Sequence, residues 1–225
     1  MDWKLLGVLP ESERDAILGR ARERQFAKGD PIIHEGDPGD SLHLISHGHV
    51  AVRLATPDGD RCIIRIIPPG GWFGELAMLS PSERMATVWA LDRVTTLAID
   101  RSTVDAVRAR IPDFDKVFVN ALVAEVKRLS FALLEAHFLP VDQRVLRRLS
   151  ELAELYASAH DGRDGRDGSA EVNLPLTQEE LAEVAGTTRP TVNKVLQRAA
   201  DSGLLALRRG QVTILDRRKL AALAR

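Results

Sequence analysis

The chain has 225 residues with nearly balanced charge, 31 lysines and arginines against 32 aspartates and glutamates, so it is long enough for one large or two small domains and is not a uniformly basic protein. Its single cysteine, Cys62, excludes an internal disulfide framework and a cysteine-ligated iron–sulfur cluster built from one chain. No apolar run approaches transmembrane length and the first residues lack a secretory pattern, so we expect a cytoplasmic protein without membrane contact.

The N-terminal half predicts a β domain. Between residues 22 and 99, short apolar runs alternate with turn clusters rich in glycine, proline and aspartate. Many short strands at this spacing are typical of a β-sandwich or barrel. After residue 99 the strand pattern stops, and a short helix is expected over residues 102–110.

A long helix is predicted over residues 112–138. Its apolar residues recur at intervals of three and four: Val119, Leu122, Val126, Leu129, Leu133 and Ala136. This spacing is narrower than the stripe of a helix that packs on its own domain, so we favour a coiled coil between two chains over ordinary packing. The six residues are therefore the expected homodimer interface.

Pro140 should end the long helix, and Asp142 is the expected cap of the next, which runs to about Ala159. The repeat that follows, residues 161–168, alternates aspartate, glycine and arginine. It is too polar and glycine-rich to fold alone, so we interpret it as a disordered surface loop and not as a metal site.

Residues 177–199 predict two helices joined by a glycine turn. Thr177 and Glu180 have the spacing of a capping box, and Gly186 permits the left-handed turn that ends the first helix. Thr188 is the expected cap of the second helix, with Pro190 in its first turn. An amphipathic helix pair is the plain alternative, but the caps and the polar face favour a helix-turn-helix.

The second helix should bury an apolar stripe and expose polar residues toward DNA. The buried residues are expected to be Val192, Val195, Leu196 and Ala199, and the outward ones Arg189, Thr191, Asn193, Lys194 and Arg198. Two apolar runs around Arg208–Arg209–Gly210 predict a β-hairpin, which would form a wing. The excess of basic residues at this end suits phosphates, so the expected DNA-binding residues are Thr177, Thr188, Arg189, Pro190, Thr191, Asn193, Lys194, Arg198, Arg208 and Arg209.

The order of these elements resembles the Crp–Fnr family of bacterial transcription regulators, and within it the cyclic AMP receptor protein branch. The sharpest motif is Phe73–Gly74–Glu75–Leu76–Ala77–Met78, followed after five residues by Arg84–Met85–Ala86. It is similar to the phosphate-binding cassette of cyclic-nucleotide-binding domains. The resemblance implies an α+β fold: a β-roll (jelly-roll) effector domain at 1–111, a dimerisation helix at 112–138 and a winged helix-turn-helix at 139–225.

The resemblance also implies a cyclic nucleotide, cyclic AMP or a relative, as effector. Gly74 would let backbone amides approach the phosphate, Glu75 would accept from the ribose 2′-hydroxyl, and Arg84 would offer a fork of donors to the phosphate. The expected effector-binding residues are Gly74, Glu75, Leu76, Arg84, Met85, Ala86, Leu129 and Ser130.

Two positions depart from the family pattern. Met85 stands where the family has a serine or threonine whose hydroxyl bonds the phosphate. Leu129 and Ser130 stand where the cyclic AMP branch has a Thr–Ser pair that contacts the adenine across the dimer. We therefore expect weaker binding, another base orientation or a different nucleotide, and a vestigial pocket remains the alternative.

The residues also limit other functions. No catalytic or metal-binding constellation is evident, and none of the six histidines lies in a haem-binding motif, so we expect neither an enzyme nor a metalloprotein. The expected function is a homodimeric regulator that binds palindromic double-stranded DNA, and RNA polymerase if it activates transcription. The alternatives are a regulator without nucleotide dependence and a nucleotide-binding subunit of a partner protein.

Overall fold

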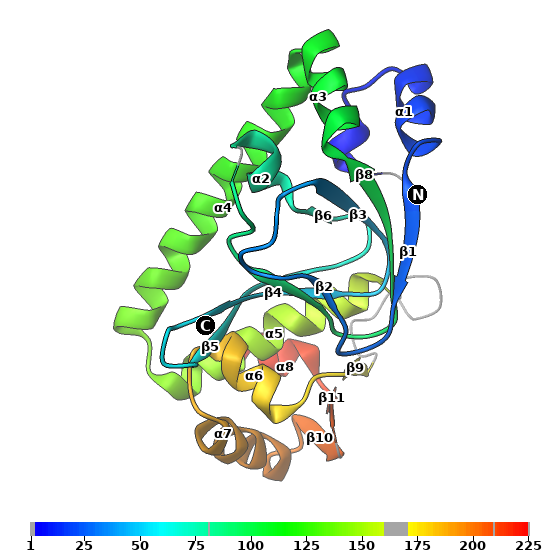
Figure 1. Ribbon diagram of the computed structural model, residues 1–225. Coiled ribbons are helices and arrows are strands. Elements are labelled where there is room, and N and C mark those ends of the chain that lie inside the picture. The colour runs from blue at the N-terminus through cyan, green and yellow to red at the C-terminus, as the bar shows by residue number, and fades with distance from the viewer. Residues whose placement is uncertain (1–2, 81, 160–170, 209, 225) are drawn as a thin grey trace. The chain divides into compact units, whose positions relative to one another are not determined.

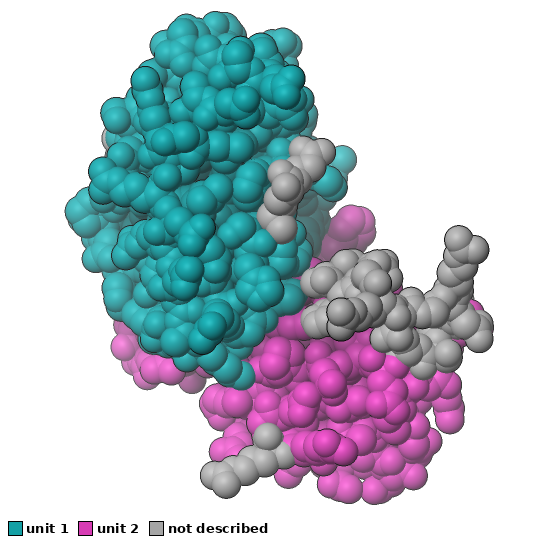
Figure 2. All heavy atoms as spheres, turned by 90° about the vertical axis from the view of Figure 1, so that its right-hand side faces the viewer, with its two compact units in different colours: residues 1–54, 64–130 teal, residues 55–63, 131–225 magenta. Residues whose placement is uncertain are grey.

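The protein is described by a computed structural model that covers residues 3–80, 82–159, 171–208 and 210–224 (Figure 1). The expected surface loop at 161–168 lies outside the described residues. The chain forms two compact units: unit 1 comprises residues 1–54 and 64–130, and unit 2 comprises residues 55–63 and 131–225 (Figure 2). No described helix is long and apolar enough to cross a membrane.

Two four-stranded sheets form the β domain expected from the sequence. The first has the order β1-β8-β3-β6, with β1 at Arg22–Phe26, β8 at Val94–Asp100, β3 at Ser41–His47 and β6 at Trp72–Phe73. The second has the order β2-β7-β4-β5, with β2 at Pro31–Ile33, β7 at Thr87–Ala90, β4 at Val50–Ala55 and β5 at Arg61–Ile67. Ile45 and Phe73 of the first sheet share a buried cluster with Val88 of the second, as expected for two sheets packed face to face.

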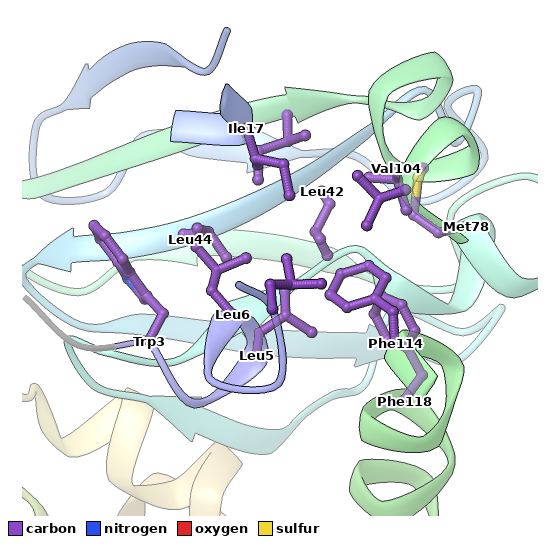
Figure 3. Packing of buried hydrophobic residues seen from close by; sticks show 13 residues of the cluster. Trp3, Leu5, Leu6, Ile17, Leu42, Leu44, Met78, Val104, Phe114 and Phe118 are labelled. Carbon is purple, nitrogen blue, oxygen red and sulfur yellow. The ribbon is translucent and has the colours of Figure 1, made fainter. Parts of the chain in front are cut away.

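The helices of unit 1 gather on a second core (Figure 3). They are the 3-10 helix η1 (Lys4–Leu6), α1 (Glu11–Leu18), α2 (Glu75–Leu79), α3 (Arg101–Arg110) and the first part of α4 (Asp113–Phe138). Phe114 and Phe118 of α4 lie beside Met78 of α2 and Val104 of α3 in this core. Each such side chain contributes about 1.5–3 kcal/mol by burial, so the start of α4 is firmly anchored.

Along the rest of α4, the expected interface residues other than Leu122 are exposed in the single chain. Val119, Val126, Leu129 and Leu133 are exposed in the single chain, Val126 at 63%. Leu122 is half-buried and lines a cavity of unit 1, whereas Val123, which the sequence reading left out, is exposed. Val126 and Leu129 line the same cavity as Leu122, and the role of the six residues as a dimer interface stays a prediction. Ala136 is also exposed.

Unit 2 contains the winged helix-turn-helix. Its elements are α5 (Val141–Ala159), β9 (Val172–Leu174), α6 (Gln178–Ala185), α7 (Arg189–Asp201), β10 (Leu205–Arg208), β11 (Gln211–Ile214) and α8 (Arg217–Leu223). The sheet order is β10-β11-β9, and the hairpin β10–β11 is the predicted wing. Asp142 does not cap α5, because the helix begins at Val141 and places Asp142 in its first turn.

Candidate effector cavity and nucleic-acid interface

The cassette turn requires glycine for two reasons. Gly74 follows β6, occupies the N-cap position of α2 and has φ +92°, a conformation that residues with a side chain disfavour. A Cβ at this position would also lie 2.8 Å from Arg84 Nη1 and 2.8 Å from the carbonyl oxygen of Ser41. The missing side chain therefore lets the guanidinium pack directly on the turn.

Arg84 is fixed by backbone and side-chain hydrogen bonds. Its amide donates to the carbonyl of Asp37 at 2.8 Å, and its carbonyl accepts from the amide of Gly36 at 2.9 Å. Nη1 donates to the carbonyl of Gly74 at 3.1 Å, and Nη2 donates to that of Ser41 at 2.7 Å. The guanidinium is thus oriented by two main-chain carbonyls and by the Ser41 hydroxyl, which accepts from Nη2 at 3.1 Å.

The charge of Arg84 is poorly compensated. The residue is 6% exposed, and burial is the main cause that lowers the pKa of its guanidinium. Within the described part of the chain, its ion pair is with Asp40, at 3.5 Å, and the Asp40 side chain is 82% exposed. Because solvent screens such a carboxylate and buried charges normally have close counter-charges, the site favours a bound anion.

Beside Arg84 lies a cavity of about 250 Å³. Its wall is mostly apolar and is formed by β2, β4, β5, the cassette, β7 and the middle of α4. The charged residues on the wall are Arg65, Glu75, Arg84 and Glu125. An apolar wall with a few charged groups is typical of small-molecule sites, which range from about 300 to 1,000 Å³.

The two carboxylates of the cavity differ in acidity. Burial raises the pKa of Glu75, and the nearby Arg65 opposes this shift. Glu125 accepts a 2.6 Å hydrogen bond from Arg128 and lies 3.7 Å from Arg65, and the hydrogen bond from Arg128 lowers the pKa of Glu125. The sequence reading missed Arg65 and Glu125, because β5 and α4 meet only in the folded chain.

Seven of the eight expected effector residues line this cavity: Gly74, Glu75, Leu76, Arg84, Met85, Ala86 and Leu129. Met85 is exposed and supplies no side-chain donor in place of the family hydroxyl. Ser130 is not among the lining residues, and its Oγ donates to the carbonyl of Val126 at 2.9 Å. Its expected contact lies across a dimer, so that role stays a prediction.

The helix-turn-helix forms with the predicted local signals. The Thr177 hydroxyl accepts from the Glu180 amide at 3.1 Å, and the Thr177 amide donates to the Glu180 carboxylate at 2.7 Å, which completes the capping box. Gly186 ends α6 with φ +60°. Thr188 occupies the cap of α7 but makes no side-chain cap bond; instead its hydroxyl lies 3.0 Å from that of Thr191.

The two faces of α7 agree with the predicted pattern. The buried residues are Val192, Val195, Leu196 and Ala199, and the exposed ones include Arg189, Pro190, Asn193, Lys194 and Arg198, with Thr191 half-buried. Arg208 is exposed at the end of β10, whereas Arg209 lies outside the described residues. The exposed face therefore offers cations and amides, which are the groups that bind phosphates and base edges.

Three contacts refine the interface. Arg198 forms a 2.7 Å ion pair with Asp142, so its guanidinium is engaged on α5. The Thr177 hydroxyl also donates to Glu180 at 3.0 Å and is fully used by the cap. Gln178, which the sequence reading missed, donates from Nε2 to Asn193 Oδ1 at 3.3 Å and joins α6 to α7. No pattern within one helix signals this contact between two helices.

Among the described residues, no three histidine, cysteine, aspartate or glutamate side chains are grouped to hold a metal ion.

Residues 23–110 match the family model of the cyclic nucleotide-binding domain, and residues 143–223 match that of the Crp-like helix-turn-helix domain.

Similar proteins span nearly the whole chain. The CRP-like cAMP-activated global transcriptional regulator of Mycobacterium tuberculosis is 30% identical over 222 residues, covering 97% of this chain and 96% of that protein. The cyclic AMP receptor protein of Thermus thermophilus is 30% identical over 218 residues, covering 97% and 94%. The crystal structure of a CRP/FNR-family transcriptional regulator from the same organism aligns with 90% of this chain and 98% of that chain, with TM-score 0.72 and 25% identity.

Proposed function

This chain belongs to the Crp–Fnr family of DNA-binding transcription regulators, and we propose that it acts as a homodimer whose affinity for DNA is set by a cyclic nucleotide bound beside Arg84. The coarser function, a Crp-like transcription regulator with a cyclic nucleotide-binding domain, follows from the family. We propose beyond this that the effector is a cyclic nucleotide, that the protein is a homodimer and that its DNA target is palindromic.

The observation that carries the proposal is the buried Arg84 guanidinium. It faces a cavity, and within the described residues its ion pair is with Asp40, whose side chain is largely exposed. A cyclic phosphate supplies a compact anion whose oxygens match the planar donors of arginine. Because position 74 is a glycine, no side chain at that position pushes the guanidinium away from the turn.

The remaining wall supports a nucleotide with its base toward α4. Glu75 sits directly after Gly74 and has a carboxylate to accept from a ribose hydroxyl. Ile33, Val52 and Val88 form an apolar wall of the cavity. On α4, Leu129 offers only apolar contact while Glu125 offers an acceptor, so the base meets different chemistry from that of the Thr–Ser pair of the cyclic AMP branch.

The test is calorimetric titration of the full-length protein with cyclic AMP and with cyclic GMP. We expect binding of one or both, its loss in Arg84→Leu, and tighter binding in Met85→Ser. A serine hydroxyl restores a hydrogen bond to a charged group, which contributes about 1.5–3 kcal/mol. Absence of binding heat and of a thermal shift at millimolar nucleotide would refute the proposed effector.

A regulator of the same fold with another effector, or with none, is the second candidate. The Met85 and Leu129 positions favour it, because both lack the polar atoms that the family uses on a cyclic nucleotide. In the titration above, the first candidate binds cyclic AMP or cyclic GMP, whereas the second binds neither. A subunit that regulates a partner protein instead of DNA would leave genomic fragments unshifted in an electrophoretic assay.

On DNA, each chain of the dimer would insert α7 in the major groove. Two such helices require a palindrome with half-site centres about 34 Å apart. Arg189 and Asn193 are the residues that we assign to base edges, and Lys194, Arg208 and Arg209 those that we assign to phosphates. If the protein activates transcription, RNA polymerase is its further partner. A bacterial regulator of this kind works in the cytoplasm.

A further inference from the structure

A polar network connects Arg84 to the middle of the first sheet. Nη2 of Arg84, which donates to the Ser41 carbonyl, also donates to Ser41 Oγ at 3.1 Å. Ser41 Oγ lies 3.3 Å from His43 Nε2, and His43 Nδ1 lies 3.2 Å from Thr96 Oγ1. Of these four residues, Arg84 lines the cavity and the other three are not among its lining residues.

The imidazole at the centre of the network has a fixed position. His43 is 1% exposed, and Thr96 is fully buried. The ring of His43 stacks on that of Phe73, with centroids 4.9 Å apart and planes 9° apart. Burial, followed by the charges of Arg84 and Arg24, lowers the pKa of His43 to about 3, although Asp40 opposes the shift. The imidazole is therefore neutral near pH 7.

The neutral ring has one N–H, and its neighbours decide where that proton lies. The Ser41 hydroxyl has a single proton, which it donates to Asp40 Oδ1 at 2.9 Å, and a carboxylate is the stronger acceptor. Ser41 Oγ is then an acceptor toward both Arg84 and His43, so the proton of the imidazole lies on Nε2. Nδ1 in turn accepts from the Thr96 hydroxyl. The hydroxyl of Ser41 and both ring nitrogens of His43 then each have a hydrogen-bond partner.

We propose that His43 is a positioning residue of the effector site, which holds Ser41 and, through it, the Arg84 guanidinium in the orientation that meets the phosphate. This inference rests on the proposed function, because it assigns to Arg84 a bound anion. Arginine side chains have many rotamers, and a guanidinium fixed before binding loses less freedom when the ligand arrives. The network is therefore expected to affect nucleotide affinity from outside the cavity.

Thr96→Val tests the network at its far end, because valine keeps the shape of threonine and removes its hydroxyl. We expect this variant to bind the preferred nucleotide, cyclic AMP or cyclic GMP, about three- to ten-fold more weakly than the unchanged protein, as for one lost hydrogen bond. Thr96→Ser should restore the affinity. Thr95→Val, on the same strand but outside the network, is the matched control and should bind normally.

A second experiment separates positioning from a general loss of stability. In an Arg84→Lys background the contact with Ser41 is already altered, so adding Thr96→Val should cost no further affinity, as residues of one network are not additive. His43→Phe keeps an aromatic ring beside Phe73, removes both nitrogens and should weaken binding as Thr96→Val does. Thermal unfolding of each ligand-free variant is measured in parallel.

Unchanged affinity in Thr96→Val, or an equal loss with and without the Arg84→Lys change, would overturn the inference while the unchanged protein still binds nucleotide. If the unchanged protein binds neither cyclic AMP nor cyclic GMP, the proposed effector fails and this inference fails with it. The two failures are therefore distinguishable.

Discussion

Glu75 is a residue whose ionisation opposes folding in the absence of a ligand. Burial raises the pKa of its carboxyl above the ordinary value of 4.5. Above the raised pKa the carboxylate is charged in both the folded and the unfolded chain, and its burial disfavours the fold. As the pH falls through the raised pKa toward 4.5, the folded chain takes up the proton first, so this group then contributes stability. The ionised Glu75 carboxylate in the cavity therefore lowers the stability of the ligand-free protein.

Glu75→Gln should therefore raise the free energy of unfolding of the ligand-free protein at pH 7. The difference between variant and unchanged protein should shrink as the pH falls through the raised pKa toward 4.5, because both side chains are then neutral. Urea unfolding between pH 4.5 and 8 measures this, with Glu35→Gln on the surface as the control. If the two free energies of unfolding differed by the same amount at every pH, the stability difference would not come from ionisation of the buried Glu75 carboxyl.

Arg189 is the side chain that we expect to read sequence. An arginine at the start of a recognition helix can form two hydrogen bonds to guanine O6 and N7. Arg189→Ala should cost about 1–3 kcal/mol at one guanine of each half-site and relax the preference there. Pro190 cannot accept from a cytosine amine, so discrimination at its base pair should be weak.

Binding-site selection followed by salt titration measures these effects. Arg208→Ala in the wing is the control, since loss of a phosphate contact weakens all sequences alike and lowers the salt slope. An Arg189→Ala protein with unaltered base preference would show that the helix reads DNA by other residues.

At the scale of elements, α4 serves both the cavity and the exposed apolar stripe. Glu125, Val126 and Leu129 line the cavity, while Val119, Val123 and Leu133 are exposed apolar residues of the same helix outside it. Exposed apolar residues in a row along a helix favour a second helix as partner. We therefore expect the protein to be a dimer through this stripe.

Val119→Asp should yield monomers, because a carboxylate buried in the interface loses its hydration without a partner, at a cost of several kcal/mol. Val119 is preferable to Leu122 and Val126, whose side chains also line the cavity. Ala124→Asp places the same charge at an exposed position off the stripe and should leave a dimer. Sedimentation at micromolar concentration distinguishes them, and a monomeric unchanged protein would contradict the interface.

The elements also show which signals a sequence carries. The caps of α6 and the glycine at 186 act within four residues, so the helix-turn-helix could be predicted from its own segment. The bounds of α4 followed from the prolines at 112 and 140, but the direction of Leu122 did not follow from its periodicity, because its neighbours come from distant strands. The strand β9 has only three residues and depends on pairing with β11. Arg65 beside Glu125 and Arg198 beside Asp142 are likewise long-range pairs.

At the scale of the whole molecule, a nucleotide that controls DNA binding must couple the affinity for effector to the affinity for DNA. A nucleotide shifts DNA affinity only if it binds the DNA-competent state more tightly than the other state, and the coupling is reciprocal. Glu125 and Leu129, which line the cavity, lie on the same continuous helix as the last turns of α4. This helix ends at Phe138, two residues before Pro140. This helix is the element that we expect to carry the coupling.

The most direct test of the central claim is the affinity for a selected palindromic DNA site, measured by fluorescence anisotropy at fixed salt with and without saturating cyclic nucleotide. The account predicts that the nucleotide tightens DNA binding about 5- to 150-fold, the usual range of allosteric coupling, and that Arg84→Leu binds the same DNA with an affinity that nucleotide does not change. Equal DNA affinity of the unchanged protein with and without nucleotide would contradict it.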